Sequence, residues 1–210
     1  MAGASLVLSD DSTISRLDRS LLWLERKFAL LSGLAVFALM ILAVVSVGGR
    51  NAMNQPISGY VDWIEQAMPL IAFMGIAYTQ REGGHIRMDL LVGNLRGRAM
   101  WAAEFVTTLA ILILMLLLVW GSFAHFQRSF DWGSPLFSRD SSMDIGLPLW
   151  PAKLLAPIAF SVLCLRLALQ LFVYGRALVS GQENPVGVPL HADGATVAAM
   201  EAAQVSGHDD

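Results

Sequence analysis

The chain has 210 residues, of which 55 % are hydrophobic and 15 % charged, and its formal net charge is −3. Long unbroken apolar blocks exclude an ordinary soluble domain, and the small net charge gives no reason to expect a nucleic-acid partner. The single cysteine, Cys164, excludes a disulfide within the chain. The N-terminus lacks a basic region and a cleavage site, so we expect no signal peptide to be removed.

Residues 12–27 carry apolar side chains at helical spacing, with basic residues between them. We expect an amphipathic interfacial helix here, lying along the cytoplasmic membrane surface with Trp23 at headgroup depth. A simple helical extension of the first membrane span is the alternative. The apolar positions are Ile14, Leu17, Leu21, Leu24 and Phe28.

Four apolar segments approach the roughly 20 residues that a helix needs to cross a bilayer. They predict an all-α integral membrane protein with spans at 28–47, 60–78, 100–125 and 147–174. The first contains no charge. The third has twelve Leu, Ile, Val or Phe side chains between Phe105 and Phe123, which favour insertion by about 4 to 7 kcal/mol.

The second span is the weakest of the four, because it begins with Asp62 and Glu65. A single Asp at its centre would cancel the insertion energy of its apolar side chains. We therefore expect both carboxylates at the membrane edge. An intramembrane protease would need a buried nucleophile with a base, but Ser32 and Ser46 of the first span have no His or Asp partner within the membrane, so we expect them to serve helix packing.

The fourth span contains charges and prolines. Lys153 and Arg166 each lie near one of its ends, where we expect them to extend to the interface. Pro148 and Pro151 are expected in its first turn, where a missing N–H is tolerated. Pro157 lies deeper and should kink the helix.

Basic residues set the expected orientation. They gather before the first span and between the second and third spans, so both chain ends are predicted to be cytoplasmic. We accordingly divide the chain into a cytoplasmic N-terminus (1–27), a four-span domain (28–175) and a disordered cytoplasmic tail (176–210). The eight residues are Arg16, Arg19, Arg26, Lys27, Arg81, Arg87, Arg96 and Arg98.

The residues that membrane chemistry requires are missing from the predicted spans. Haem binding needs paired histidines, and only His125 is near a span, at its outer end. Glu104 is the best candidate for a proton site, but it lies six residues from Arg98, about 9 Å along a helix, and favours an interfacial ion pair. We predict no catalytic, cofactor-binding or metal site. The polar loop 80–91 is either a solvated turn or a docking element for another subunit.

The sequence GGHIRMDLL within that loop closely resembles the GxHIxVDLL signature of the small membrane (DctQ-like) subunit of TRAP (tripartite ATP-independent periplasmic) transporters. Ile145 to Pro157, IGLPLWPAKLLAP, is similar to the family's GIPMWWVYLALP. The chain departs from the pattern at Met68-Pro69, where the family commonly has a basic residue. The matching positions are Arg50, Trp63, Glu65, Gly75, Gly84, His85, Asp89, Pro148, Trp150, Pro157 and Arg166.

The resemblance implies a scaffold subunit of the bacterial inner membrane, with these residues as structural or docking candidates. It implies two partners besides the lipid bilayer: a large, DctM-like permease subunit and a periplasmic solute-binding protein. Together they would import organic acids, chiefly carboxylates, by sodium-coupled secondary transport, and the chain itself would not be an enzyme. The alternative is a free-standing four-span membrane enzyme or redox protein.

Overall fold

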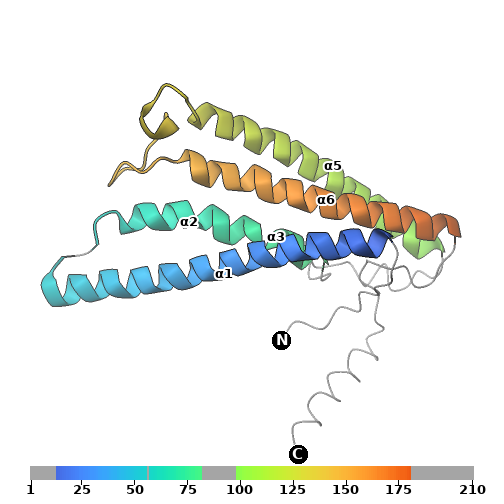
Figure 1. Cartoon of the computed structure of the whole chain (residues 1–210), viewed down its shortest axis with the longest axis horizontal. Helices are drawn as coiled ribbons and strands as arrows, with labels where there is room; N and C mark the ends of the chain where they lie inside the picture. The colour runs from blue at the N-terminus through green and yellow to red at the C-terminus, as the bar shows by residue number, and fades with distance from the viewer. Residues whose placement is uncertain (1–12, 56, 82–97, 181–210) are drawn as a thin grey trace, which may run out of the picture.

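The computed structural model describes residues 13–55, 57–81 and 98–180, and this part of the chain is helical (Figure 1). Two isolated β-bridges, Phe130 to Ser138 and Ser141 to Pro148, lie in one loop. The helices are α1 (Thr13–Met53), α2 (Tyr60–Met74), α3 (Ile76–Arg81), α5 (Arg98–Ser129), the 3-10 turn η1 (Pro135–Phe137) and α6 (Trp150–Ser180).

Helix α6 lies at the centre of the bundle. It packs along α5 on one side and against α2 and α3 on the other, and α1 covers α2 and α3 (Figure 1). Buried side chains of α6 accordingly form two apolar clusters. Tyr174 stacks on Trp101 of α5 with ring centroids 5.9 Å apart, and Leu163 and Leu167 pack with Ala77 of α3.

Three described helices, α1, α5 and α6, are long and apolar enough to cross a membrane. The most apolar window of α6 is 39 % buried inside the protein, whereas that of α1 is 0 % buried. Large apolar side chains of α1, such as Leu34, Phe37 and Val44, are thus exposed over about half their surface. Such a helix needs lipid or a partner around it.

The expected interfacial helix is not confirmed as a separate element. Helix α1 runs without interruption from Thr13 to Met53, so the alternative, a helical extension of the first span, is what the structure contains. One face of the extension is covered by protein, because Asp18 and Glu25 are buried. Amphipathic spacing shows that a helix has a covered face, but not whether lipid or protein covers it.

The second predicted span consists of two helices, α2 and α3, which meet at Gly75. The last carbonyl groups of a helix lack partners within it. One of them, the Ile71 carbonyl, accepts a hydrogen bond from Ser32 Oγ of α1 at 3.1 Å. Ser32 therefore serves the packing of two helices, as expected. Both α2 and α3 contact the long helices α1 and α6, which span the break between them.

The third and fourth predicted spans correspond to α5 and α6, and both helices are longer than expected. Pro148 precedes α6 instead of lying in its first turn, whereas Pro151 does lie there. Helix α6 continues through Pro157, which is buried. The described part of α6 ends at Ser180, so residues 176–180 of the predicted disordered tail are helical. The rest of that tail, 181–210, lies outside the described residues.

Candidate functional site

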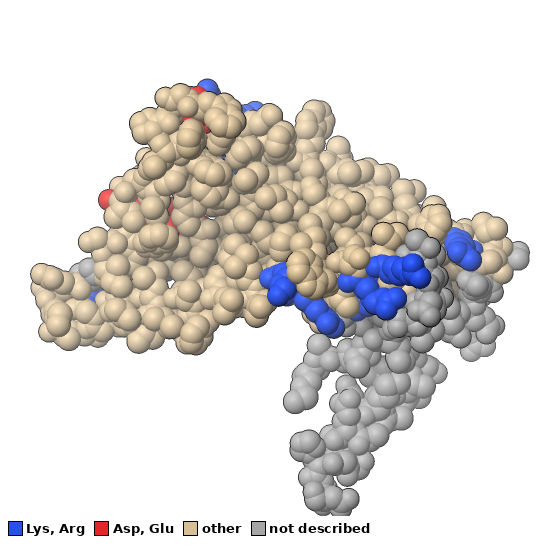
Figure 2. Space-filling model, in the orientation of Figure 1, with Lys and Arg blue, Asp and Glu red and all other residues tan. Residues whose placement is uncertain are grey.

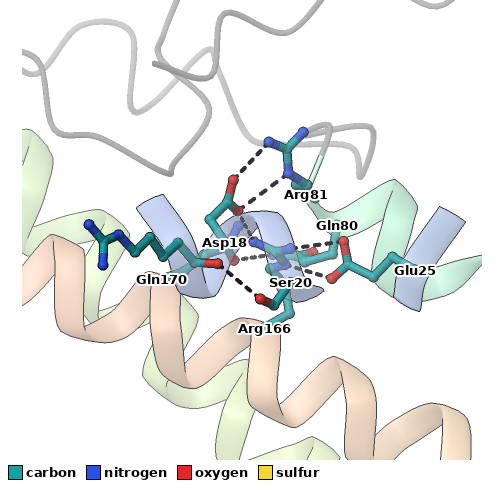
Figure 3. Close-up of polar contacts among 8 residues, drawn as sticks. Asp18, Ser20, Glu25, Gln80, Arg81, Arg166 and Gln170 are labelled. Atoms are coloured by element: carbon teal, nitrogen blue, oxygen red, sulfur yellow. Dashed lines mark hydrogen bonds and ion pairs between the residues drawn. The ribbon is translucent and has the colours of Figure 1, made fainter. Parts of the chain in front are cut away.

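A buried ion-pair network joins three helices in the half of the bundle where α1 begins and α6 ends (Figure 3). It comprises Asp18 and Glu25 of α1, Arg81 of α3 and Arg166 of α6. The side chains of Arg166 and Glu25 are 0 % exposed, that of Asp18 3 % and that of Arg81 12 %. We refer to these four residues as the ion-pair network.

Arg166 is the centre of the network. Its Nε and Nη2 donate to the two carboxylate oxygens of Glu25 at 2.7 and 2.8 Å, and its Nη1 donates to Asp18 Oδ1. A planar guanidinium suits this arrangement, because its fixed N–H groups pair with a carboxylate in two parallel hydrogen bonds. The same side chain thus contacts two turns of α1.

The network follows from spacing along α1. Asp18 and Glu25 are seven residues apart, which places them about two turns apart on one face of a helix. Arg81, the last residue of α3, donates from Nη2 to Asp18 Oδ2 at 2.9 Å. Two cations and two carboxylates therefore balance one another, as charges withdrawn from water require.

An amide pair lies beside the network, one helical turn along α6 from Arg166. Gln80 Nε2 donates to Gln170 Oε1 at 3.1 Å, and Gln170 is only 1 % exposed. This contact adds a second polar link between α3 and α6. The ion-pair network and the amide pair hold helices together, because both carboxylates of the network are already bound by guanidinium groups.

The opposite end of the bundle is closed by the loop between α5 and α6. Asp62 Oδ2 accepts three hydrogen bonds from it, from Ser142 Oγ at 2.6 Å and from the amides of Ile145 at 2.9 Å and Asp144 at 3.2 Å. A side chain at Gly59, where φ is 70°, would place its Cβ 2.6 Å from Ile145. The start of α2 is therefore fitted closely to this loop.

Two further contacts order the same loop. Lys153 Nζ donates to Asp140 Oδ2 at 2.6 Å and to Ser129 Oγ at 3.1 Å. Hydrogen bonds from Lys153 and Ser129 lower the pKa of Asp140 below its usual value. The indole N–H of Trp150 donates to the Leu136 carbonyl at 3.0 Å, and Leu136 has a φ of 55°, a conformation that costs a bulky residue about 1 to 3 kcal/mol.

The structure separates the predicted site residues into inward and outward groups. Arg166 and Pro157 are buried, whereas Arg50, Trp63 and Glu65 are exposed. The Arg166 guanidinium does not extend to the interface as expected, because both acidic partners lie on α1 within the bundle. The expectation that Asp62 sits at a membrane edge missed its role, since it is buried under the loop.

The remaining predicted positions contribute to helix junctions or fall outside the described part. Gly75 separates α2 from α3, and the Pro148 carbonyl accepts a hydrogen bond from the Gln66 side chain. Gly84, His85 and Asp89 lie outside the described residues. The loop 80–91 is thus described only at Gln80 and Arg81.

Sequence reasoning did not identify the partners of Arg166. A usable signal was present: Asp18 and Glu25 interrupt an otherwise basic segment at a spacing of two turns, and an arginine within a span demands acidic partners.

Among residues 13–55, 57–81 and 98–180, no three His, Cys, Asp or Glu side chains are grouped as metal ligands would be. Glu104 is buried on α5.

Comparison with known proteins identifies the family. The family model described as "Tripartite ATP-independent periplasmic transporters, DctQ component" matches residues 39–174. No curated protein matches the chain. The matched region holds α2, α3, α5 and most of α6, and with them Arg81 and Arg166, but it begins after Asp18 and Glu25. The chain belongs to the DctQ family, the small membrane component of TRAP transporters.

Proposed function

We propose that this chain is the stationary scaffold subunit of a sodium-coupled TRAP transporter that imports organic acids, chiefly carboxylates. A large permease subunit would carry the substrate and sodium, and a periplasmic protein would deliver the substrate. The observation that supports a scaffold role is the ion-pair network. It uses two arginines and two carboxylates to tie α1 and α3 to α6, so these buried charges serve cohesion and not substrate binding.

The proposed topology has four spans, with α2 and α3 together forming the second. The stretch from Tyr60 to Arg81 has 22 residues, about 33 Å of helix against about 30 Å of hydrocarbon. Its polar side chains support this proposal, because Asp62, Gln66, Gln80 and Arg81 all bond within the protein. Polar groups in a membrane need such partners.

The proposed orientation places both chain ends in the cytoplasm, because four exposed basic residues lie in the first part of α1: Arg16, Arg19, Arg26 and Lys27. Thiol labelling of intact spheroplasts tests it. In a Cys164→Ala background, three single cysteines should resist an impermeant reagent and two should react. Labelling of the cysteine at Arg96 from outside would overturn the four-span topology. The protected positions are Ser12, Arg96 and Ala199, and the reactive ones are Ser58 and Ser138.

The transport role is tested by reconstitution into liposomes. The chain alone should move no organic acid under a sodium gradient, and uptake should require the large subunit, the binding protein and sodium together. Uptake by the chain alone would refute the scaffold proposal and favour Glu104 as a coupling residue. A free-standing enzyme or redox protein would instead retain its activity without either partner.

The exposed positions Arg50, Trp63 and Glu65 are proposed to dock the large subunit, because their side chains do not serve internal packing. Trp63 is 49 % exposed although it lies on an apolar helix. Trp63→Ala should therefore reduce recovery of the two-subunit complex without unfolding the isolated chain. Val61→Ala, an exposed position on the same helix, provides the matched control. Equal losses for both variants would contradict a specific docking role.

A further inference from the structure

The first part of α1 separates its charges by sign. The four basic residues between Ser15 and Lys27 are exposed, whereas both acidic residues of this segment are buried in the ion-pair network. The outward surface of the segment therefore carries four positive charges and no negative charge of its own. We call the four residues Arg16, Arg19, Arg26 and Lys27 the basic face.

The basic face is continuous along the helix. At about 100° per residue, its four side chains and Trp23 fall within an arc of roughly 100°, away from the arc that holds Asp18 and Glu25. Figure 2 shows the Lys and Arg side chains gathered on one side of the molecule, where α1 begins. Trp23 is 64 % exposed, and Lys27 Nζ lies 5.8 Å from its ring centroid.

Position along α1 indicates the depth of the basic face in a bilayer. It ends at Lys27, and from Leu30 to Val47 the exposed surface of α1 is lined by large apolar side chains, whereas among the described residues before Lys27 only Leu17 and Trp23 are large, apolar and exposed. A cationic surface next to a hydrocarbon-facing surface lies at headgroup level, where tryptophan is also favoured. Phosphate groups of anionic lipids are the complementary charges available at that level.

We propose that the basic face is a binding surface for the headgroups of anionic phospholipids, with the phosphates held by its guanidinium and ammonium groups. Burial of Asp18 and Glu25 serves this surface, because two exposed carboxylates would cancel half of its charge. The apolar exposed face of α1 then accommodates the acyl chains of the same lipids. Lipid recognition by the basic face does not depend on which substrate is transported.

Lipid addition to the purified full chain in neutral detergent tests the proposal. Thermal unfolding and native mass spectrometry are recorded with phosphatidylglycerol and with phosphatidylcholine of the same acyl chains. Phosphatidylglycerol should bind more tightly and raise the Tm more, and this preference should decline as NaCl is raised, since exposed charges are screened. An unchanged preference at high salt would overturn the proposal without any variant.

Neutralising the basic face should abolish the preference. The quadruple variant Arg16→Gln/Arg19→Gln/Arg26→Gln/Lys27→Gln should bind phosphatidylglycerol at least about tenfold less tightly, because each basic residue near an anionic surface strengthens binding about fivefold. The control Arg50→Gln/Arg128→Gln/Arg176→Gln removes three exposed cations elsewhere and should keep the preference. Equal effects of the two variants, or none in the quadruple variant, would contradict a localised surface.

Two further experiments distinguish anionic lipid from two other possible occupants of the basic face. The tail 181–210 has five acidic residues and no Lys or Arg. If that tail covered the basic face, changing its five carboxylates to amides in the full chain would strengthen lipid binding; we expect no change. If the surface took free phosphate, inorganic phosphate at the same concentration would raise the Tm as phosphatidylglycerol does; we expect no such shift. Either result would overturn the lipid assignment.

Discussion

Replacing Arg166 by glutamine tests the ion-pair network most directly. Glu25 would lose both hydrogen bonds from Arg166, and Asp18 would keep only those from Arg81. Two buried carboxylates would then face one guanidinium. Breaking a buried ion pair by removing one partner costs about 3 to 5 kcal/mol, because the remaining charge stays buried and uncompensated.

That cost converts into a measurable loss of thermal stability. For chains of 150–250 residues, about 1 kcal/mol corresponds to roughly 2–4 °C, so Arg166→Gln should lower the Tm by about 6–20 °C. The assay is thermal unfolding of the purified chain in one detergent. Arg176→Gln, an exposed arginine on the same helix, is the control and should change the Tm little.

A charge-balanced variant separates electrostatics from packing. Glu25→Gln combined with Arg166→Met removes one charge of each sign and leaves the Asp18 to Arg81 pair in place. This double variant should recover most of the stability lost in Arg166→Gln, since replacing both partners avoids an uncompensated buried charge. The reasoning is refuted if Arg166→Gln matches the Arg176→Gln control, or if the double variant is no more stable than Arg166→Gln.

Three further predictions concern the two loops. Asp62→Ala should speed hydrogen exchange of the Asp144 and Ile145 amides, which donate hydrogen bonds to the Asp62 carboxylate. Unchanged exchange would contradict the role of Asp62 in holding the loop. The hydrogen bond from Lys153 lowers the pKa of Asp140 in the folded chain, so the ionised carboxylate stabilises the fold above the unfolded-state pKa of about 3.8, and this stabilisation is lost as the pH falls through the folded-state pKa. The Tm difference between wild type and Asp140→Asn should therefore shrink from pH 7 to pH 3, and a constant difference would argue against the Asp140 to Lys153 ion pair. His85→Ala and Asp89→Asn should reduce recovery of the two-subunit complex in detergent, while any complex that assembles keeps the sodium and pH dependence of its transport. Normal assembly with a changed sodium or pH dependence would contradict a docking role for these two residues.

The accuracy of the sequence predictions depended on what each pattern encodes. The third span could be placed because its apolar run is uninterrupted and needs no partner to explain it. The second predicted span is divided at Gly75, and the contacts that hold its two parts come from Ser32 on α1 and Gln170 on α6. Those contacts depend on which helices become neighbours, and hydrophobicity along one segment does not contain that information.

The covered face of the start of α1 could not be assigned from the sequence for a related reason. Apolar residues at helical spacing predict a helix with a covered face, and lipid and protein produce the same spacing. Charge pairing distinguishes the two cases, because Arg166 within a predicted span needs acidic partners and the chain offers two on one helical face, Asp18 and Glu25. Considering charges in different segments together would have favoured the helical extension.

The ion-pair network also explains how the two parts of the chain depend on each other. The region that matches the family begins at residue 39, so Arg81 and Arg166 lie inside it and Asp18 and Glu25 lie before it. Arg166 therefore obtains its two acidic partners from a segment outside the matched region. A change at either acidic residue would leave a buried arginine short of a partner, and would also free the first turns of α1 from α6. The position of the basic face at the end of the bundle thus rests on the same contacts that stabilise Arg166 inside it.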